Sequence, residues 1–193
     1  MRVLIACEYS GTVRDAFIKR GHYAMSCDLL PTDAPGPHYQ GDVFDVINDD
    51  WDLMVAHPPC TYLSVSGMHW TARGLRDPQL TEDALAFVRR LMDASIERIA
   101  IENPVSVISS RIRKPDQIVQ PWWFGDDASK KTCLWLKNLP KLTPTKILAG
   151  DEKTRRANQT STGQNKLAPS KDRWKIRSKT YPGIAEAMSK QWA

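Results

Sequence analysis

The sequence predicts an α/β fold in which a mainly parallel sheet is flanked by helices. Short apolar runs of strand length alternate along the chain with amphipathic runs of helical length, an order typical of strands joined by helical crossovers. Unusual polar residues directly follow the apolar runs instead of interrupting them. In an open parallel sheet, ligands bind outside the carboxyl ends of the strands. The sequence therefore predicts a ligand site at that edge of the sheet.

The first quarter of the chain contains two predicted strands, one helix and one loop. The run VLIAC at 3–7 is a short apolar strand, and GTVRDAFIKRG is a helix that ends at Gly21. The inner side of this helix is formed by three apolar residues, Val13, Phe17 and Ile18. HYAMSCDLL is a second strand that ends at Asp28, and the turn residues of 31–42 predict a loop.

The middle of the chain repeats this alternation. WDLMVA at 51–56 is a strand that ends at two prolines, and 81–95 is the clearest helix, which Thr81 can cap. Its apolar face consists of Ala84, Leu85, Val88, Leu91 and Met92. ERIAIENP is the next strand and stops at Glu102, and KKTCLWL at 130–136 is a further strand candidate. These alternating elements predict right-handed crossovers between parallel strands.

The composition predicts one soluble domain. Its 193 residues suit a single core, and 41% hydrophobic with 25% charged residues is typical of globular proteins. No apolar stretch approaches the roughly 20 residues that a membrane helix needs, and the N-terminus lacks a signal-peptide cleavage site. The four cysteines fit neither a metal knuckle nor a disulfide framework. We expect a cytoplasmic protein with reduced thiols, no metal and no membrane association.

Positive charge is concentrated in one segment of the chain. Residues 151–180 contain 9 lysines and arginines against 3 acidic residues, whereas residues 1–150 contain 17 against 18. A neutral body with one basic segment is typical of a protein that binds a polyanion, and the alternative is a solvated basic loop. The segment 143–183 is weakly periodic and predicts long loops or short elements, followed by a closing helix in GIAEAMSKQWA.

Asp28 is a candidate for binding a nucleoside. A carboxylate at the end of the second strand can accept hydrogen bonds from both ribose hydroxyls, although an ordinary strand-end carboxylate remains the alternative. The preceding EYSGTVR has one glycine and not the three of a pyrophosphate-binding loop. The combination favours a nucleoside cofactor without phosphates, and S-adenosylmethionine fits this description.

Cys60 and Glu102 are candidates for covalent chemistry. Pro58 and Pro59 hold the backbone extended before the thiol, and Glu102 ends a neighbouring strand. A thiolate and an acid facing one crevice suit the activation of an electron-poor ring such as cytosine, with thiolate addition at C6 and a proton or hydrogen bond at N3. Taken singly, a buried structural cysteine and a turn at Glu102-Asn103-Pro104 are the alternatives.

With these residues, the chain resembles the DNA cytosine-5 methyltransferases, in a shortened form like those of phages. PPCTYLSVSG resembles the family's Pro-Cys nucleophile motif and the loop after it, and IENP resembles the Glu-Asn motif that grips the target cytosine. CEYSGTVRDAF, CDLL and GDVFDV occupy the positions of the cofactor loop, the ribose acid and the adenine contact. SKKTCLWL and SKTYPGIAEAM lie where the family has an arginine-rich strand and a C-terminal cofactor motif. The resemblance covers most of 1–136 and 178–192, and it implies a Rossmann-like class I S-adenosylmethionine-dependent methyltransferase fold.

The resemblance assigns roles residue by residue. It makes Cys60 the nucleophile and Glu102 the group that binds N3 and the exocyclic amine of cytosine. The residues that it places around S-adenosylmethionine are Tyr9, Ser10, Gly11, Asp28, Leu29, Asp42 and Pro58. The residues that it places toward the substrate are Ser64, Gly67, Asn103, Lys130 and Lys131.

A separate target-recognition domain is missing or reduced to about 143–180. A basic loop supplies phosphate contacts and few base contacts, so we expect DNA binding with short or loose sequence preference. The candidates for this surface are Arg155, Arg156, Arg173, Trp174 and Arg177; the other tryptophans, including Trp122, Trp123 and Trp135, are expected mostly in the core. Two alternatives remain open: C5 modification of a free cytidine nucleotide, and a catalytically silent relative that binds DNA.

Overall fold

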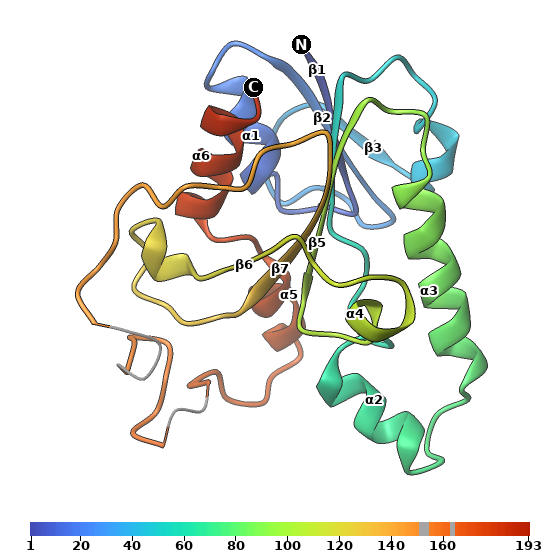
Figure 1. The fold of residues 1–193 in the computed structure, drawn as a ribbon, viewed down its shortest axis with the longest axis vertical. Helices are drawn as coiled ribbons and strands as arrows, with labels where there is room; N and C mark the ends of the chain where they lie inside the picture. Colours follow the sequence, from blue (N-terminus) through green and yellow to red (C-terminus); the bar gives the residue numbers. More distant parts are fainter. Residues whose placement is uncertain (151–154, 163–164) are drawn as a thin grey trace.

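The computed structural model describes residues 1–150, 155–162 and 165–193. One seven-stranded sheet forms its centre, in the order β3-β2-β1-β4-β5-β7-β6 (Figure 1). The strands are β1 (Arg2–Ala6), β2 (Tyr23–Asp28), β3 (His38–Gln40), β4 (Leu53–Ala56), β5 (Arg98–Pro104), β6 (Gln117–Val119) and β7 (Thr132–Lys137). The helices are α1 (Thr12–Ile18), α2 (Val65–Ala72), α3 (Gln79–Met92), α4 (Ile108–Arg111), α5 (Arg173–Ser178) and α6 (Pro182–Gln191), with 3₁₀ turns η1 (Val43–Asp45) and η2 (Pro121–Trp123).

The sheet is mixed, although most of its strands are parallel. β3, β2, β1, β4 and β5 pair in parallel, whereas β7 runs antiparallel to both β5 and β6. The prediction of a mainly parallel sheet is therefore correct for the half that carries the predicted ligand edge. The apolar run of β7 forms a strand, as the sequence indicated. Its direction is defined by antiparallel pairing with β5 and β6, and a local sequence pattern does not report such pairing.

Helices cover both faces of the sheet. In Figure 1, α1 and α6 lie on one side and α3 on the other. Along β1, Val3 and Ile5 join the core under α1 and α6, while Leu4 joins the core under α3. This alternation is the period-two pattern of a strand buried on both faces, and it explains why β1 reads as an uninterrupted apolar run.

Three details differ from the sequence-based expectation. Ile18 is 38% exposed, because it lies five residues after Val13 and so points away from the buried face of α1. Thr81 does not cap α3: the helix begins at Gln79, and the buried Thr81 hydroxyl donates to the Tyr62 carbonyl at 3.2 Å. The loop predicted at 31–42 contains the short edge strand β3.

The chain reverses its direction of progress through the sheet at β1. From β1 it moves outward to β2 and β3, and it then returns to the opposite side of β1 to form β4 and β5. A crevice opens outside the carboxyl ends of the two strands at such a reversal. The turns after β1 and β4 therefore flank the position where this fold offers a ligand site.

Candidate active site

The turn after β1 is organised by Glu8. Its buried carboxylate accepts hydrogen bonds from the backbone amides of Val13 at 2.7 Å and Arg14 at 3.2 Å, and from the Ser10 hydroxyl at 3.1 Å. These amides belong to the first turn of α1, where a helix has unpaired N–H groups and a positive partial charge. The Glu8 carboxylate therefore fills the position that a phosphate group would take in a dinucleotide site.

Gly11 continues this turn with left-handed backbone geometry, at φ 74°. A Cβ at this position would lie 3.0 Å from the Arg14 guanidinium carbon, so the turn requires glycine for both its backbone and its space. The fully buried Arg14 guanidinium donates to the Ser26 hydroxyl and to the carbonyls of Ala34 and Pro35. Arg14 thereby fixes the loop after β2 against the start of α1, and sequence reasoning did not identify it.

Asp28 ends β2 beside this turn. Its carboxylate accepts the backbone N–H of Leu30 at 3.0 Å, and partial burial raises its pKa. Two further predicted cofactor residues are exposed. Leu29, directly after β2, is 74% exposed, and Asp42 caps η1 by accepting the Phe44 N–H. Asp28 thus lies at the carboxyl end of β2 with one carboxylate oxygen, Oδ1, engaged by the backbone.

Cys60 lies in the turn after β4. The backbone N–H of His57 still pairs with Ala6 of β1 at 2.9 Å, and the chain then leaves the sheet through Pro58 and Pro59. The Cys60 carbonyl accepts the N–H groups of Leu63 and Ser64, which closes a helical turn after the cysteine. Of the four free thiols, only Cys60 is on an exposed residue.

Glu102 and Asn103 occupy the end of β5, the neighbour of β4. Asn103 is 1% exposed, and its side-chain N–H donates to the Pro58 carbonyl at 2.8 Å. The amide predicted to face the substrate therefore ties the cysteine turn to β5 instead. The Glu102 carboxylate accepts a hydrogen bond from His57 Nδ1 at 2.9 Å.

The charge of Glu102 acts on the Cys60 thiol. Desolvation is the main cause that raises the pKa of the Cys60 thiol, and the negative charge of Glu102 raises it further, while Lys130 and Arg177 lower it. Burial alone would raise the pKa of Glu102, but the hydrogen bond from His57 and the charge of Lys130 hold it below its ordinary value. Lys130 lies two residues before β7, whose Thr132 pairs with Pro104 of β5. Its charge lowers the pKa of both Cys60 and Glu102.

Ser64 and Gly67 build the start of α2. The Ser64 hydroxyl accepts the Gly67 N–H at 3.2 Å as an N-cap, and Ser64 also forms a bridge with Ser106 beyond β5. A Cβ at Gly67 would collide with the backbone oxygen of Thr61. The spacing that resembles a substrate loop is thus also what this helix start requires.

Helix α5 packs against the turn after β1, a contact that the sequence did not reveal. The Tyr9 hydroxyl donates to the Lys175 carbonyl at 2.8 Å and contacts the Ser178 hydroxyl at 2.9 Å. Lys179, directly after α5, pairs with Asp33 of the loop after β2 at 2.9 Å. Trp174 stacks obliquely near Tyr9 and stays 52% exposed. Part of the basic segment therefore lies over the predicted cofactor region.

The basic segment contributes fewer exposed arginines than predicted. Arg156 is 5% exposed: its guanidinium lies over the Trp122 ring and donates to the Ala149 carbonyl at 2.9 Å. Its assignment to a DNA-binding surface is wrong, because the segment folds back onto the protein at this position. Arg155 and Arg177 are exposed, Arg173 is half-buried, and Lys130 donates to the Arg177 carbonyl at 3.2 Å.

The remaining predicted site residues differ in exposure. Lys131 is exposed, whereas Ser10, Pro58 and Tyr9 are buried, with Tyr9 6% exposed. Among the tryptophans expected in the core, Trp122 and Trp135 are buried and Trp123 is partly buried.

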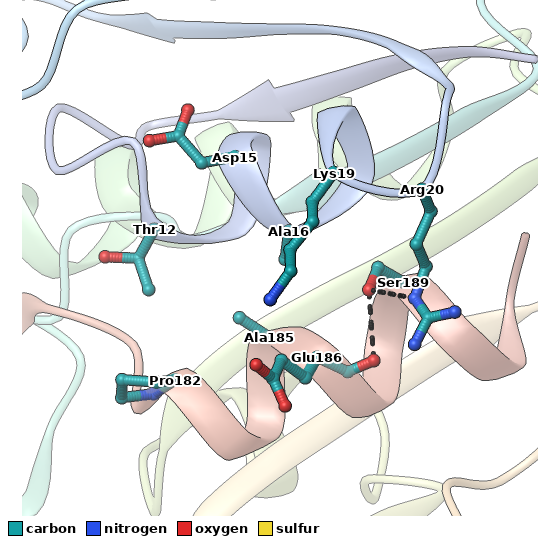
Figure 2. A pocket seen from close by; sticks show the side chains of 9 residues that line it. All are labelled: Thr12, Asp15, Ala16, Lys19, Arg20, Pro182, Ala185, Glu186 and Ser189. Carbon is teal, nitrogen blue, oxygen red and sulfur yellow. Dashed lines mark hydrogen bonds between the residues drawn. The ribbon is translucent and has the colours of Figure 1, made fainter.

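A separate groove of about 400 Å³ runs between α1 and α6 (Figure 2). In this groove the Arg20 guanidinium donates to the Ser189 hydroxyl at 3.1 Å, and Ser189 donates to the Glu186 carbonyl. Asp15, Lys19 and further polar groups line it. Among the described residues, none of the predicted site residues lines this groove, so it belongs to the helix layer and not to the crevice at the strand ends.

Alkylation of Cys60 by iodoacetamide is expected to have a pH midpoint above that of free cysteine, because only the thiolate reacts and its pKa is raised. Replacing Lys130 with alanine removes a cation that lowers this pKa, so the midpoint should move further upward. Lys131→Ala, at the adjacent exposed position, is the matched control. Peptide-resolved mass spectrometry across a pH series measures both midpoints; an unchanged midpoint in Lys130→Ala would exclude the proposed role of its charge.

Comparison with known proteins extends the description of the fold. No protein-family model and no curated protein matches the sequence. The structure is similar to that of a methyltransferase of Entamoeba histolytica, EhMeth, with a TM-score of 0.52 and 15% identity over 77% of this chain. The match covers 57% of the EhMeth chain, so this chain spans little more than half of that protein's length. This likeness supports a Rossmann-like α/β fold.

In residues 1–150, 155–162 and 165–193, no helix is long and apolar enough to cross a membrane. Within the same residues, no group of three or more His, Cys, Asp or Glu side chains is arranged to hold a metal ion.

Proposed function

We propose that this protein is an S-adenosylmethionine-dependent methyltransferase that modifies C5 of cytosine in DNA. The observation that carries the proposal is the placement of Cys60 and Glu102 at the ends of adjacent parallel strands, with Lys130 interacting with both. A nucleophile, an acid and a cation are the groups that addition to a pyrimidine ring requires.

The geometry beside β1 supports a nucleoside cofactor without phosphates. Asp28 is available to bind ribose hydroxyls, and the Glu8 carboxylate already satisfies the N–H groups of α1 that a pyrophosphate would need. Tyr9 and Gly11 would form the adjoining wall. S-adenosylmethionine, when bound, supplies the methyl group.

The residues of this chain would act on the ring in a fixed order. The Cys60 thiolate bonds to C6 as a proton is placed on N3 near Glu102, and the ring's electron pair moves to C5, which becomes the nucleophile that takes up the methyl group. A base then removes the C5 proton, the C6–S bond breaks and the proton on N3 returns to Glu102, so that the aromatic ring is restored with Cys60 free. Lys130 stabilises the thiolate before addition.

DNA is the preferred substrate because of the positive charge near the crevice. Arg177 and Lys130 act on Cys60 electrostatically, and Trp174 presents an exposed ring on the same helix as Arg177. A stacked base hides its C6 face, so the cytosine would have to leave the duplex. Basic side chains contact phosphates, and an exposed tryptophan ring stacks on any base. We therefore propose that the protein binds DNA with a short or loose sequence preference.

Covalent trapping on 5-fluorocytosine DNA tests the proposal directly. Fluorine at C5 blocks the final elimination, so a stable protein–DNA adduct is expected only when S-adenosylmethionine is present. Denaturing electrophoresis and mass spectrometry of the cross-linked peptide identify the attached residue, which should be Cys60. An adduct at another residue, or none with any cytosine substrate, would refute the proposed reaction.

A free cytidine nucleotide is the second candidate substrate. It is favoured by the small size of the elements near the carboxyl ends of the strands, which in the described part of the chain include the short helices α2 and α5 (Figure 1). Transfer of labelled methyl groups to duplex DNA, single-stranded DNA and dCMP separates the two substrates. A silent DNA-binding relative would retain DNA in every Cys60 variant and label none of the three.

Asp28→Asn is expected to weaken S-adenosylmethionine binding about tenfold, because a neutral amide loses one charge-assisted hydrogen bond to the ribose. Isothermal titration calorimetry with the free protein measures the affinity. Asp49→Asn, an exposed carboxylate in the turn before β4, serves as the control. Equal affinities in the wild type and Asp28→Asn would remove Asp28 from the cofactor site.

A further inference from the structure

His57 is hydrogen-bonded to the Glu102 carboxylate. Its Nδ1 lies 2.9 Å from Glu102 Oε2, and both side chains are only 9% exposed. Its backbone N–H is fixed to the Ala6 carbonyl at 2.9 Å, so the ring is held by the sheet itself. The other ring nitrogen, Nε2, is buried and has no hydrogen-bond partner among the described residues.

We propose that His57 is a positioning residue: it holds Glu102 by one carboxylate oxygen, Oε2, so that the other oxygen, Oε1, carries the proton that is delivered to N3 of the pyrimidine. This inference rests on the proposed function and adds a residue to it. Only Oε2 accepts the histidine, and Oε1 has no hydrogen bond within the described residues, so Oε1 is the oxygen left for the base.

The charges around Glu102 explain why its proton matters. Lys130 and the Cys60 and Cys133 thiols interact with Glu102, and Asp28 interacts with His57. The Cys60 thiolate and the Glu102 carboxylate are like charges that oppose each other in a partly desolvated space. A proton on Oε1 of Glu102 removes one negative charge when the thiolate forms.

The proton transfer balances with the addition step. As Cys60 bonds to C6, the proton on Oε1 of Glu102 passes to N3, and the carboxylate that remains keeps the Nδ1–H hydrogen bond from the neutral imidazole of His57 on Oε2. When Cys60 leaves C6, the proton on N3 returns to Oε1. The donated hydrogen bond also prevents the carboxylate from rotating away from the ring.

Two substitutions of His57 separate this role from simple packing. His57→Asn keeps an N–H donor near the Nδ1 position, whereas His57→Ala removes the donor. With 5-fluorocytosine DNA and S-adenosylmethionine, adduct formation should slow about 100-fold in His57→Ala, and His57→Asn should recover about tenfold of that loss. In both variants the affinity for S-adenosylmethionine should stay within about twofold of the wild type.

A measurement without substrate tests the contact independently of the reaction. In protein with ¹³C-labelled glutamate carboxyl groups, the Glu102 signal, assigned by its loss in Glu102→Gln, should titrate at higher pH in His57→Ala than in the wild type. An unshifted titration, or equal adduct rates in the wild type and both variants, would overturn the inference. If the wild type forms no adduct, the proposed function fails, and the carboxyl titration alone then decides whether His57 controls Glu102.

Discussion

Replacing Cys60 with alanine is expected to abolish both methyl transfer and covalent capture of 5-fluorocytosine DNA. Addition at C6 has no substitute nucleophile in this position: the other three thiols are not on exposed residues, and burial raises the pKa of Cys27 to about 12 and of Cys133 to about 11. Cys60→Ser should be equally inactive, because a hydroxyl is far less ionised than a thiol. A loss of at least about 10⁴-fold in transfer rate is expected.

The remaining properties of the Cys60 variants should be nearly unchanged. The side chain is exposed and its backbone carbonyl, which caps the turn at Leu63 and Ser64, is retained. Affinity for S-adenosylmethionine, measured by calorimetry, should therefore remain within about twofold of the wild type. Thr61→Ala, at the adjacent exposed residue, controls for disturbance of the turn. Methylation by Cys60→Ala at a rate near that of Thr61→Ala would contradict the mechanism.

Glu102→Gln is expected to change two properties of Cys60 in opposite directions. Adduct formation should fall by about 10²- to 10³-fold, because glutamine carries no transferable proton for N3. Alkylation of Cys60 by iodoacetamide should shift to lower pH, because a negative charge that raises the pKa of the thiol has been removed. A thiol that becomes easier to ionise yet slower with cytosine would separate the role of the acid from that of the nucleophile.

Glu97→Gln serves as the matched control, since this residue lies directly before the opposite end of β5. Far-ultraviolet circular dichroism and thermal unfolding check that Glu102→Gln still folds. If adduct formation and alkylation both slowed in Glu102→Gln, the turn at Cys60 would have been distorted and the assignment of Glu102 would lack support. Unchanged adduct formation would exclude Glu102 from the reaction.

The strand ends of the candidate site could be predicted because they depend on short-range pattern. Apolar runs mark β1, β4 and β5, and the residue after each run must lie at the carboxyl edge if the strands are parallel. This reasoning placed Asp28, Cys60 and Glu102 on one edge. The direction of β7 and the existence of β3 depend on long-range pairing, and neither is recorded in local composition.

The parts that could not be predicted are contacts between distant segments. Nothing in the sequence around Tyr9 indicates that its hydroxyl meets α5 some 166 residues later. Arg156 looked like its neighbour Arg155, and only the packing on Trp122 separates the buried residue from the exposed one. His57 could have been noticed as a titratable residue between a buried strand and two prolines, but its partner is 45 residues away.

The contact between α5 and Tyr9 would link the two proposed binding surfaces in one thermodynamic cycle. The helix exposes Trp174 to the solvent, and its inner side contacts the turn after β1. A ligand bound on either side of α5 would change the free energy of the same few contacts. Reciprocity would then require that DNA bound outside alter the affinity for the nucleoside inside by the same factor as the reverse.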